Sequence, residues 1–199
     1  MKRLLYICAT LCVLMAIAAA SMGVLNVSGH SLREAHSAQV LSALSTTTPD
    51  TYFVMKVVDG DTIDVYMAGK NERLRLVGMD TPEVVDPRKP VQCYGREASA
   101  EGHTLLENQW VRLEYDPIAG TYDKYGRMLA YVFRLDGLFY NEFMIAHGYA
   151  HEYTYKSQHY KYQAEFKSAE TSAKKESAGF WSSSTCGGNT MKAASTEGS

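Results

Sequence analysis

Residues 52–79, YFVMKVVDGDTIDVYMAGKNERLRLVGM, decide the fold. Residues 52–58 and 62–67 are rich in β-branched and aromatic side chains, and an Asp-Gly-Asp turn separates them, which is typical of two strands joined by a tight connection. Residues 73–79 begin with alternating arginine and leucine, the pattern of a half-buried strand. The stretch therefore predicts three consecutive strands that can form a meander.

The chain beyond this stretch predicts two more strands and three helices. Ala98, Gly102 and Leu105 recur at helical spacing, and Gly148 can end a helix at its left-handed position. The expected helices cover residues 95–109, 138–147 and 162–179, and the expected strands cover residues 111–115 and 128–134. Five short strands with a helix between the third and the fourth predict an α+β fold, a five-stranded OB-type β-barrel with three helices.

The two ends of the chain differ in composition from the domain between them. Lys2 and Arg3 precede an apolar run that ends in small residues, so residues 1–20 are typical of a signal peptide. The run is also long enough to be retained as a membrane anchor. Residues 21–50 predict a flexible spacer or pro-segment, residues 51–183 one globular domain, and residues 184–199 a polar tail that contains Cys186 and is disordered after it. We therefore expect a secreted or cell-envelope protein.

Cysteine content and charge limit the classes of function. Only Cys93 and Cys186 lie outside the N-terminal apolar run, and an even pair in an exported protein predicts a disulfide, with two free thiols as the alternative. The net charge of −2 excludes wholesale electrostatic binding to nucleic acid. Any such binding requires a local basic patch.

Two acidic motifs contain the candidate metal ligands. DGDT at residues 59–62 occupies the first turn, and DTPE at residues 80–83 follows the third strand. Their carboxylates, with a threonine carbonyl, are hard oxygen ligands that suit calcium, although each motif alone is also a common turn. Arg75 and Arg127 favour a phosphodiester substrate, because guanidinium groups bind phosphate oxygens through two parallel hydrogen bonds.

The segments VVDGDTIDV, RLVGMDTPE, YGREAS and DKYGR resemble the staphylococcal nuclease family. The intervals between Asp61, Arg75, Asp80, Glu83 and Arg127 match the family pattern as well. The resemblance implies that residues 51–183 form a nuclease domain. It further implies a calcium-dependent endonuclease that hydrolyses DNA and RNA with low sequence specificity and gives 3′-phosphate ends.

The resemblance also implies a role for each matching residue. The calcium ligands would be Asp61, Asp80 and the backbone carbonyl of Thr81, with Asp59 behind them. The catalytic residues would be Glu83 as general base and Arg75 and Arg127 as phosphate clamps. The substrate-binding residues would be Lys124, Tyr125, Tyr153 and Tyr155.

The chain departs from the family in its near-neutral charge, its cysteine pair and Ser157, which stands where the family has proline after Lys156. Stacking of tyrosine rings on bases favours single-stranded DNA or RNA as substrate. We expect a monomer that needs no protein partner. The alternative is a non-catalytic OB module that binds nucleic acid or peptides, but such modules lose the acids and arginines that this chain retains.

Overall fold

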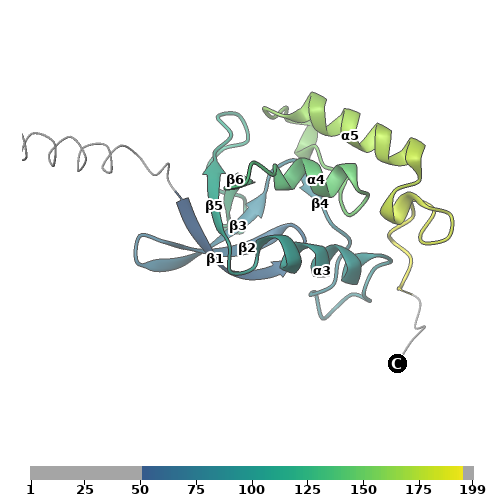
Figure 1. The fold of residues 1–199 in the computed structure, drawn as a ribbon, viewed down its shortest axis with the longest axis horizontal. Coiled ribbons are helices and arrows are strands. Elements are labelled where there is room, and N and C mark those ends of the chain that lie inside the picture. The colour runs from purple at the N-terminus through teal and green to yellow at the C-terminus, as the bar shows by residue number, and fades with distance from the viewer. Residues whose placement is uncertain (1–50, 195–199) are drawn as a thin grey trace, which may run out of the picture. The chain divides into compact units, whose positions relative to one another are not determined.

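The computed structural model describes residues 51–194, which contain a closed five-stranded barrel (Figure 1). Its strands are β1 (Thr51–Asp59), β2 (Thr62–Met67), β3 (Lys70–Leu76), β5 (Trp110–Glu114) and β6 (Met128–Arg134). They follow one another around the barrel as β1-β2-β3-β6-β5, and β5 pairs back onto β1. β3 and β6 run parallel, and the other neighbours are antiparallel. This confirms the predicted OB-type barrel.

Alternating apolar side chains fill the barrel. Ile63 and Val65 of β2 are buried, and so are Leu74 and Leu76 of β3. β1 keeps residues 54 and 57 buried although they are three positions apart, because its pairing with β2 shifts register between residues 54 and 56. Such an irregularity bends a strand and increases its twist, which helps a small barrel to close.

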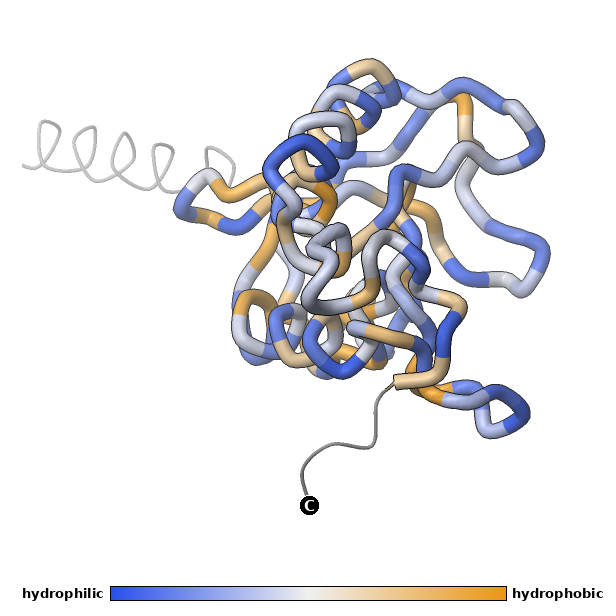
Figure 2. The backbone as a smooth tube through the Cα atoms, turned by 90° about the vertical axis from the view of Figure 1, so that its right-hand side faces the viewer, coloured by the Kyte–Doolittle hydropathy of each residue, from blue (hydrophilic) through white to orange (hydrophobic). Residues whose placement is uncertain are grey.

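Three helices pack against the barrel and against one another. α3 (Gly95–Leu106) packs on β1, and α4 (Tyr140–Ala146) lies between β6 and α5 (Gln163–Glu176). Phe166 and Ala173 of α5 are buried, as the helical spacing predicted. Figure 2 shows hydrophilic residues concentrated in the loops that project from this body.

All three predicted helices are too long, and two short strands were missed. Asn108 adopts a left-handed φ of 59°, so α3 ends at residue 106 rather than 109. Phe139 forms a β-bridge with Phe133, and α4 covers residues 140–146 rather than 138–147. Ser177 adopts a left-handed φ of 55°, and α5 covers residues 163–176 rather than 162–179. β4 (Met79–Asp80) and β7 (His151–Glu152) form a separate two-stranded sheet. The predicted loop at residues 153–158 contains the 3-10 turn η1 (Tyr155–Ser157).

The end of the described chain is ordered, contrary to the expected disordered tail. A second 3-10 turn, η2 (Gly179–Trp181), follows α5. Cys93 and Cys186 then form the expected disulfide, with a Cα–Cα distance of 6.0 Å. The Cys93 amide donates to the Lys192 carbonyl at 2.8 Å, and the Ala194 amide donates to the Val91 carbonyl at 2.8 Å. These main-chain bonds order a polar segment that composition alone predicts to be disordered.

The signal peptide or anchor and the spacer expected over residues 1–50 lie outside the described residues, as do residues 195–199. Between residues 51 and 194, no helix is both long and apolar enough to cross a membrane.

Candidate active site

One cavity of about 970 Å³ is lined by all eleven residues for which the sequence predicts a site role. They come from the β1–β2 turn, β3, β4 and the loop after it, the β5–β6 loop, and the segment after β7. They are Asp59, Asp61, Arg75, Asp80, Thr81, Glu83, Lys124, Tyr125, Arg127, Tyr153 and Tyr155. Segments far apart in the sequence therefore meet at one cleft.

The strand pairing explains why the two arginines and the first acidic motif meet. Thr62 of β2 pairs with Arg75 of β3, and the Leu76 amide donates to the Asp61 carbonyl at 2.9 Å. On its other side, β3 runs parallel to β6, whose first residue directly follows Arg127. The barrel register therefore brings Arg75 of β3 close to Asp61, which directly precedes β2, and to Arg127, which directly precedes β6.

Arg75 forms ion pairs with both candidate metal-binding carboxylates. Its Nη1 lies 2.9 Å from Oδ2 of Asp61, and its Nη2 donates to Oδ1 of Asp80 at 2.6 Å. The same Nη1 donates to the Met79 carbonyl at 2.9 Å, and the Thr81 amide donates to Oδ2 of Asp61 at 2.9 Å. With 13% of its side chain exposed, Arg75 is fixed between the two acidic motifs.

The carboxylates of this cluster are crowded, and the pKa values of two of them, Asp59 and Asp80, are raised. Burial and the nearby charge of Asp61 raise the pKa of Asp59 to about 7. Burial also raises the pKa of Asp80, and the Arg75 guanidinium opposes part of that rise. Neighbouring anionic groups that are partly removed from water favour a cation between them.

The donors present suit a hard cation. Within residues 51–194, no group of three or more His, Cys, Asp and Glu side chains is arranged to hold a metal ion. The set expected from the sequence has only two such side chains, Asp61 and Asp80, and adds the Thr81 carbonyl. Because all three donors are oxygens, the set fits calcium better than zinc or copper.

The loop after Glu83 holds the carboxylate of Glu83. Its Oε1 accepts the amides of Val84, Val85 and Asp86 at 3.0, 2.8 and 3.0 Å. The other carboxylate oxygen, Oε2, takes part in none of these bonds. The loop thereby restricts the orientation of a carboxylate that lines the cleft.

Asp123 orients Arg127, a role for this residue that the motifs alone did not predict. Nε of Arg127 donates to Oδ2 of Asp123 at 2.7 Å, while Oδ1 accepts the amides of Tyr125 and Arg127 at 2.9 Å each. The ring of Tyr125 is 71% exposed and lies 5.4 Å from the guanidinium of Arg127. An acid four residues before an arginine, across a Gly-containing turn, is the signal that could have identified it.

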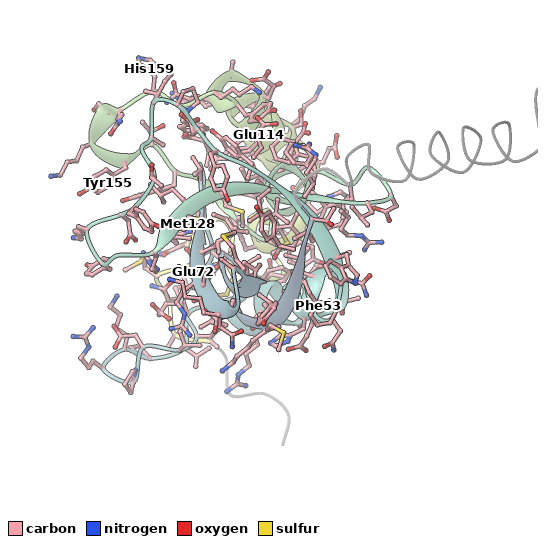
Figure 3. All side chains as sticks on the ribbon, turned by 90° about the vertical axis from the view of Figure 1, so that its left-hand side faces the viewer. Phe53, Glu72, Glu114, Met128, Tyr155 and His159 are labelled. Atoms are coloured by element: carbon pink, nitrogen blue, oxygen red, sulfur yellow. A yellow bond between two sulfur atoms is a disulfide. The ribbon has the colours of Figure 1, made fainter. Side chains whose placement is uncertain are left out.

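The rings of Tyr153 and Tyr155 provide an aromatic surface on the same cleft. Their centroids are 6.4 Å apart, and Figure 3 shows Tyr155 at the edge of the molecule. Lys156 and Ser157 have φ values of 47° and 61°. Proline cannot adopt a φ of 61°, so this loop has a conformation that the proline of the family would not allow.

The cleft also contains residues that no sequence motif predicted. Gln92 and His151 line it, and so do residues 188–191 near the C-terminus. The Thr190 hydroxyl lies 3.1 Å from Nε2 of His151, and a carboxyl oxygen of Glu170 lies 3.5 Å from its Nδ1. Only the folded structure brings the C-terminal residues to the cleft.

Comparisons with known proteins agree with this geometry. The family model described as staphylococcal nuclease homologue matches residues 73–183. The chain is 45% identical over 141 residues to the thermonuclease of Staphylococcus hyicus, which covers 71% of this chain and 81% of that protein. It is 43% identical over 132 residues to the thermonuclease of Staphylococcus intermedius, an alignment that covers 66% of this chain and 76% of that protein. It is 36% identical over 129 residues to endonuclease YncB of Bacillus subtilis, an alignment that covers 65% of this chain and 60% of that protein. The chain therefore belongs to the staphylococcal nuclease family.

Proposed function

We propose that the chain is an exported, calcium-dependent nuclease that hydrolyses DNA and RNA with low sequence specificity and leaves 3′-phosphate ends. One observation carries the proposal: two guanidinium groups and three carboxylates from distant segments line one cleft. They belong to Arg75, Arg127, Asp61, Asp80 and Glu83. Relatives named thermonuclease and endonuclease support the reaction class.

Asp61, Asp80 and the Thr81 carbonyl would hold the calcium ion. Bound there, calcium would polarise a phosphate oxygen as a Lewis acid. Arg75, which pairs with both carboxylates, keeps the two acidic motifs together and offsets their mutual repulsion.

Glu83 would act as the general base. Its Oε1 is engaged by three main-chain amides, so we assign the attacking water to Oε2. The carboxylate takes a proton from that water while the water oxygen bonds to phosphorus. The bond between phosphorus and the 5′-oxygen breaks, the leaving 5′-oxygen takes up a proton from solvent to give a hydroxyl, and the phosphate stays on the 3′-oxygen.

Arg75 and Arg127 would stabilise the additional negative charge of the five-coordinate transition state. Asp123 holds Arg127 through Nε and Nη2, and a guanidinium group has five N–H donors. Arg127 can therefore bind phosphate while Asp123 keeps it oriented.

The exposed tyrosines would bind the bases. Tyr125, Tyr153 and Tyr155 line the cleft and are exposed to solvent. Stacking does not depend on the identity of the base, and it needs unpaired bases. The proposal therefore includes low sequence specificity and a preference for single-stranded substrate.

The test is digestion of denatured DNA and of RNA by the purified protein, with calcium and with chelator, followed by end-group analysis. We expect cleavage only with calcium, and 3′-phosphate ends. Glu83→Gln should still bind the nucleic acid but cleave it at least about 100-fold more slowly. Full cleavage in chelator would contradict calcium dependence. Binding without turnover by the wild type would instead favour the non-catalytic module.

Export needs a separate experiment. The full chain is expressed in a secretion-competent bacterium, and the N-terminal sequence of the product is determined. A product in the medium that starts near residue 21 would support a cleaved signal peptide. A membrane-bound product that retains residues 1–20 would support an anchor, and a product confined to the cytoplasm would contradict export.

A further inference from the structure

The segment 186–194, here named the C-terminal strap, runs beside the end of the loop that begins at Glu83. The disulfide between Cys93 and Cys186 fixes one end of it. Ala193 forms a β-bridge with Gln92, and main-chain bonds on either side of this bridge join residues 91 and 93 to the strap at 2.8 Å each. The strap is therefore attached to the end of the loop at both of its own ends, by the disulfide at Cys186 and by main-chain pairing of residues 192–194 with residues 91–93.

Gln92 connects the strap to Glu83. Its main-chain amide donates to the Glu83 carbonyl at 2.9 Å, and its side-chain Oε1 accepts the Glu83 amide at 2.7 Å. Both main-chain polar groups of Glu83 are thus bonded to one residue. Nε2 of Gln92 lies 3.3 Å from the sulfur of Met191 in the strap.

The strap also contacts β7, the short strand that pairs with the start of the second acidic motif. Thr190 is buried, and its hydroxyl lies 3.1 Å from Nε2 of His151. His151 pairs with Asp80 across the β4–β7 sheet. One short segment therefore contacts the neighbours of both Glu83 and Asp80.

We propose that Gln92 is a positioning residue for Glu83, and that the C-terminal strap fixes Glu83 relative to Asp80 through Gln92 and His151. This inference rests on the proposed function, because it concerns the placement of the proposed general base. A displacement of about 1 Å at a reacting group can slow catalysis about 100-fold. The loop that starts at Glu83 must therefore be held at both ends to keep the proposed general base in place.

The first test is Gln92→Met, which keeps the length of the side chain and removes its amide. We expect kcat to fall about tenfold with KM within about twofold, because the base is displaced while substrate contacts stay. The control is Gln109→Met, the same change at an exposed glutamine outside the cleft. Equal effects of the two variants, or a change in KM alone, would overturn the proposal.

The second test asks whether Gln92 acts through Glu83. Gln92→Met is combined with Glu83→Gln, and kcat is compared in both backgrounds. Residues that act through one another are not additive, so we expect Gln92→Met to change the residual rate of Glu83→Gln by less than about twofold. A second tenfold loss in that background would show that Gln92 acts elsewhere.

The third test does not depend on activity. Hydrogen exchange followed by NMR reports the protection of the Glu83 amide in the wild type, in Gln92→Met and in the double variant Cys93→Ser/Cys186→Ser. We expect protection to fall in both variants while amides in the barrel strands stay protected. Unchanged protection of Glu83 would overturn the positioning role. An inactive wild type would instead refute the proposed function, and the exchange would still decide what Gln92 does.

Discussion

Arg75 shows how a single side chain can serve both the fold and the site. Its guanidinium pairs with Asp61 and Asp80, which are partly removed from water. Without that positive charge, the two carboxylates would repel each other. The same planar group lines the cleft, where it can bind phosphate.

Arg75→Lys should lower kcat/KM for denatured DNA by about 100-fold at saturating calcium, because an ammonium group cannot bridge two acceptors in the way a guanidinium group does. The matched control is Arg73→Lys, two residues away on β3, where the arginine is 51% exposed and pairs with Asp64. Initial rates and circular dichroism of both variants are the measurement. A similar loss in both would remove the specific role of Arg75.

Asp116 is a buried carboxylate that ties the β5–β6 loop to the start of α5. It accepts the amides of Ile118 and Ala119 at 2.6 and 2.8 Å, the amide of Lys161 at 2.7 Å and the hydroxyl of Tyr131. Burial raises its pKa, but these hydrogen bonds outweigh burial and hold the pKa below 3.8. The ionised form therefore stabilises the folded protein above the ordinary aspartate pKa, and this stabilisation is lost as pH falls through the lower folded value.

Asp116→Asn should lower the free energy of unfolding by about 1–3 kcal/mol near neutral pH. The difference from wild type should narrow in acid, below the ordinary aspartate pKa, because the wild-type carboxylate loses its stabilising charge as it takes up a proton. Urea denaturation at both pH values measures this, with Asp136→Asn as the control at a side chain that is 55% exposed. If Asp116→Asn lost the same amount of unfolding free energy at both pH values, the stabilisation would not come from the ionised carboxylate of Asp116.

At the scale of elements, the end of α4 packs against the segment that follows α5. Gly148 has a φ of 69°, and a Cβ there would lie 2.2 Å from the Ala178 carbonyl oxygen. The Phe180 amide donates to the Gly148 carbonyl at 3.0 Å. This main-chain contact places η2, from which the chain continues into the C-terminal strap.

Gly148→Ala should therefore destabilise the protein more than Gly120→Ala. Both glycines have positive φ, but a Cβ at Gly120, where φ is 90°, would meet no atom within 4 Å. We expect about 1 kcal/mol of backbone strain at Gly120, and at least about twice that at Gly148. Thermal unfolding of both variants compares them, and equal shifts in Tm would show that the contact with Ala178 relaxes without loss.

The elements also show what sequence patterns can predict. The bounds of β2 and β6 agree with the prediction, because their apolar and β-branched residues form continuous short strands. β4 and β7 have two residues each, and they exist only because Met79 meets Glu152 from far along the chain. No local pattern contains that information.

At the scale of the whole molecule, the disulfide links two cysteines, Cys93 and Cys186, that are separated by 93 positions in the sequence. The chain between them contains α3, β5, β6, α4 and α5. The candidate site depends on the same long-range organisation, because closure of the barrel brings its residues to one cleft. The motifs predicted which residues would meet. The order of the C-terminal strap was not predictable, because its hydrogen bonds come from residues 91–93 rather than from its own composition.

The double variant Cys93→Ser/Cys186→Ser should lose about 2–4 kcal/mol of unfolding free energy, because the crosslink restricts the unfolded chain. Urea denaturation of the variant and of the oxidised and reduced wild type provides the measurement. Reduced wild type should match the variant. A variant as stable as the oxidised wild type would show that the crosslink adds little beyond the surrounding contacts.

The covalent ring between Cys93 and Cys186 contains the β5–β6 loop, where Tyr122 and Tyr125 are exposed. A protease that cuts this loop would generate two fragments that stay attached through sulfur. Such a nicked molecule would migrate as one band in electrophoresis until a reductant separated the pieces. Because the disulfide holds the two fragments together, they could refold into the same barrel after unfolding.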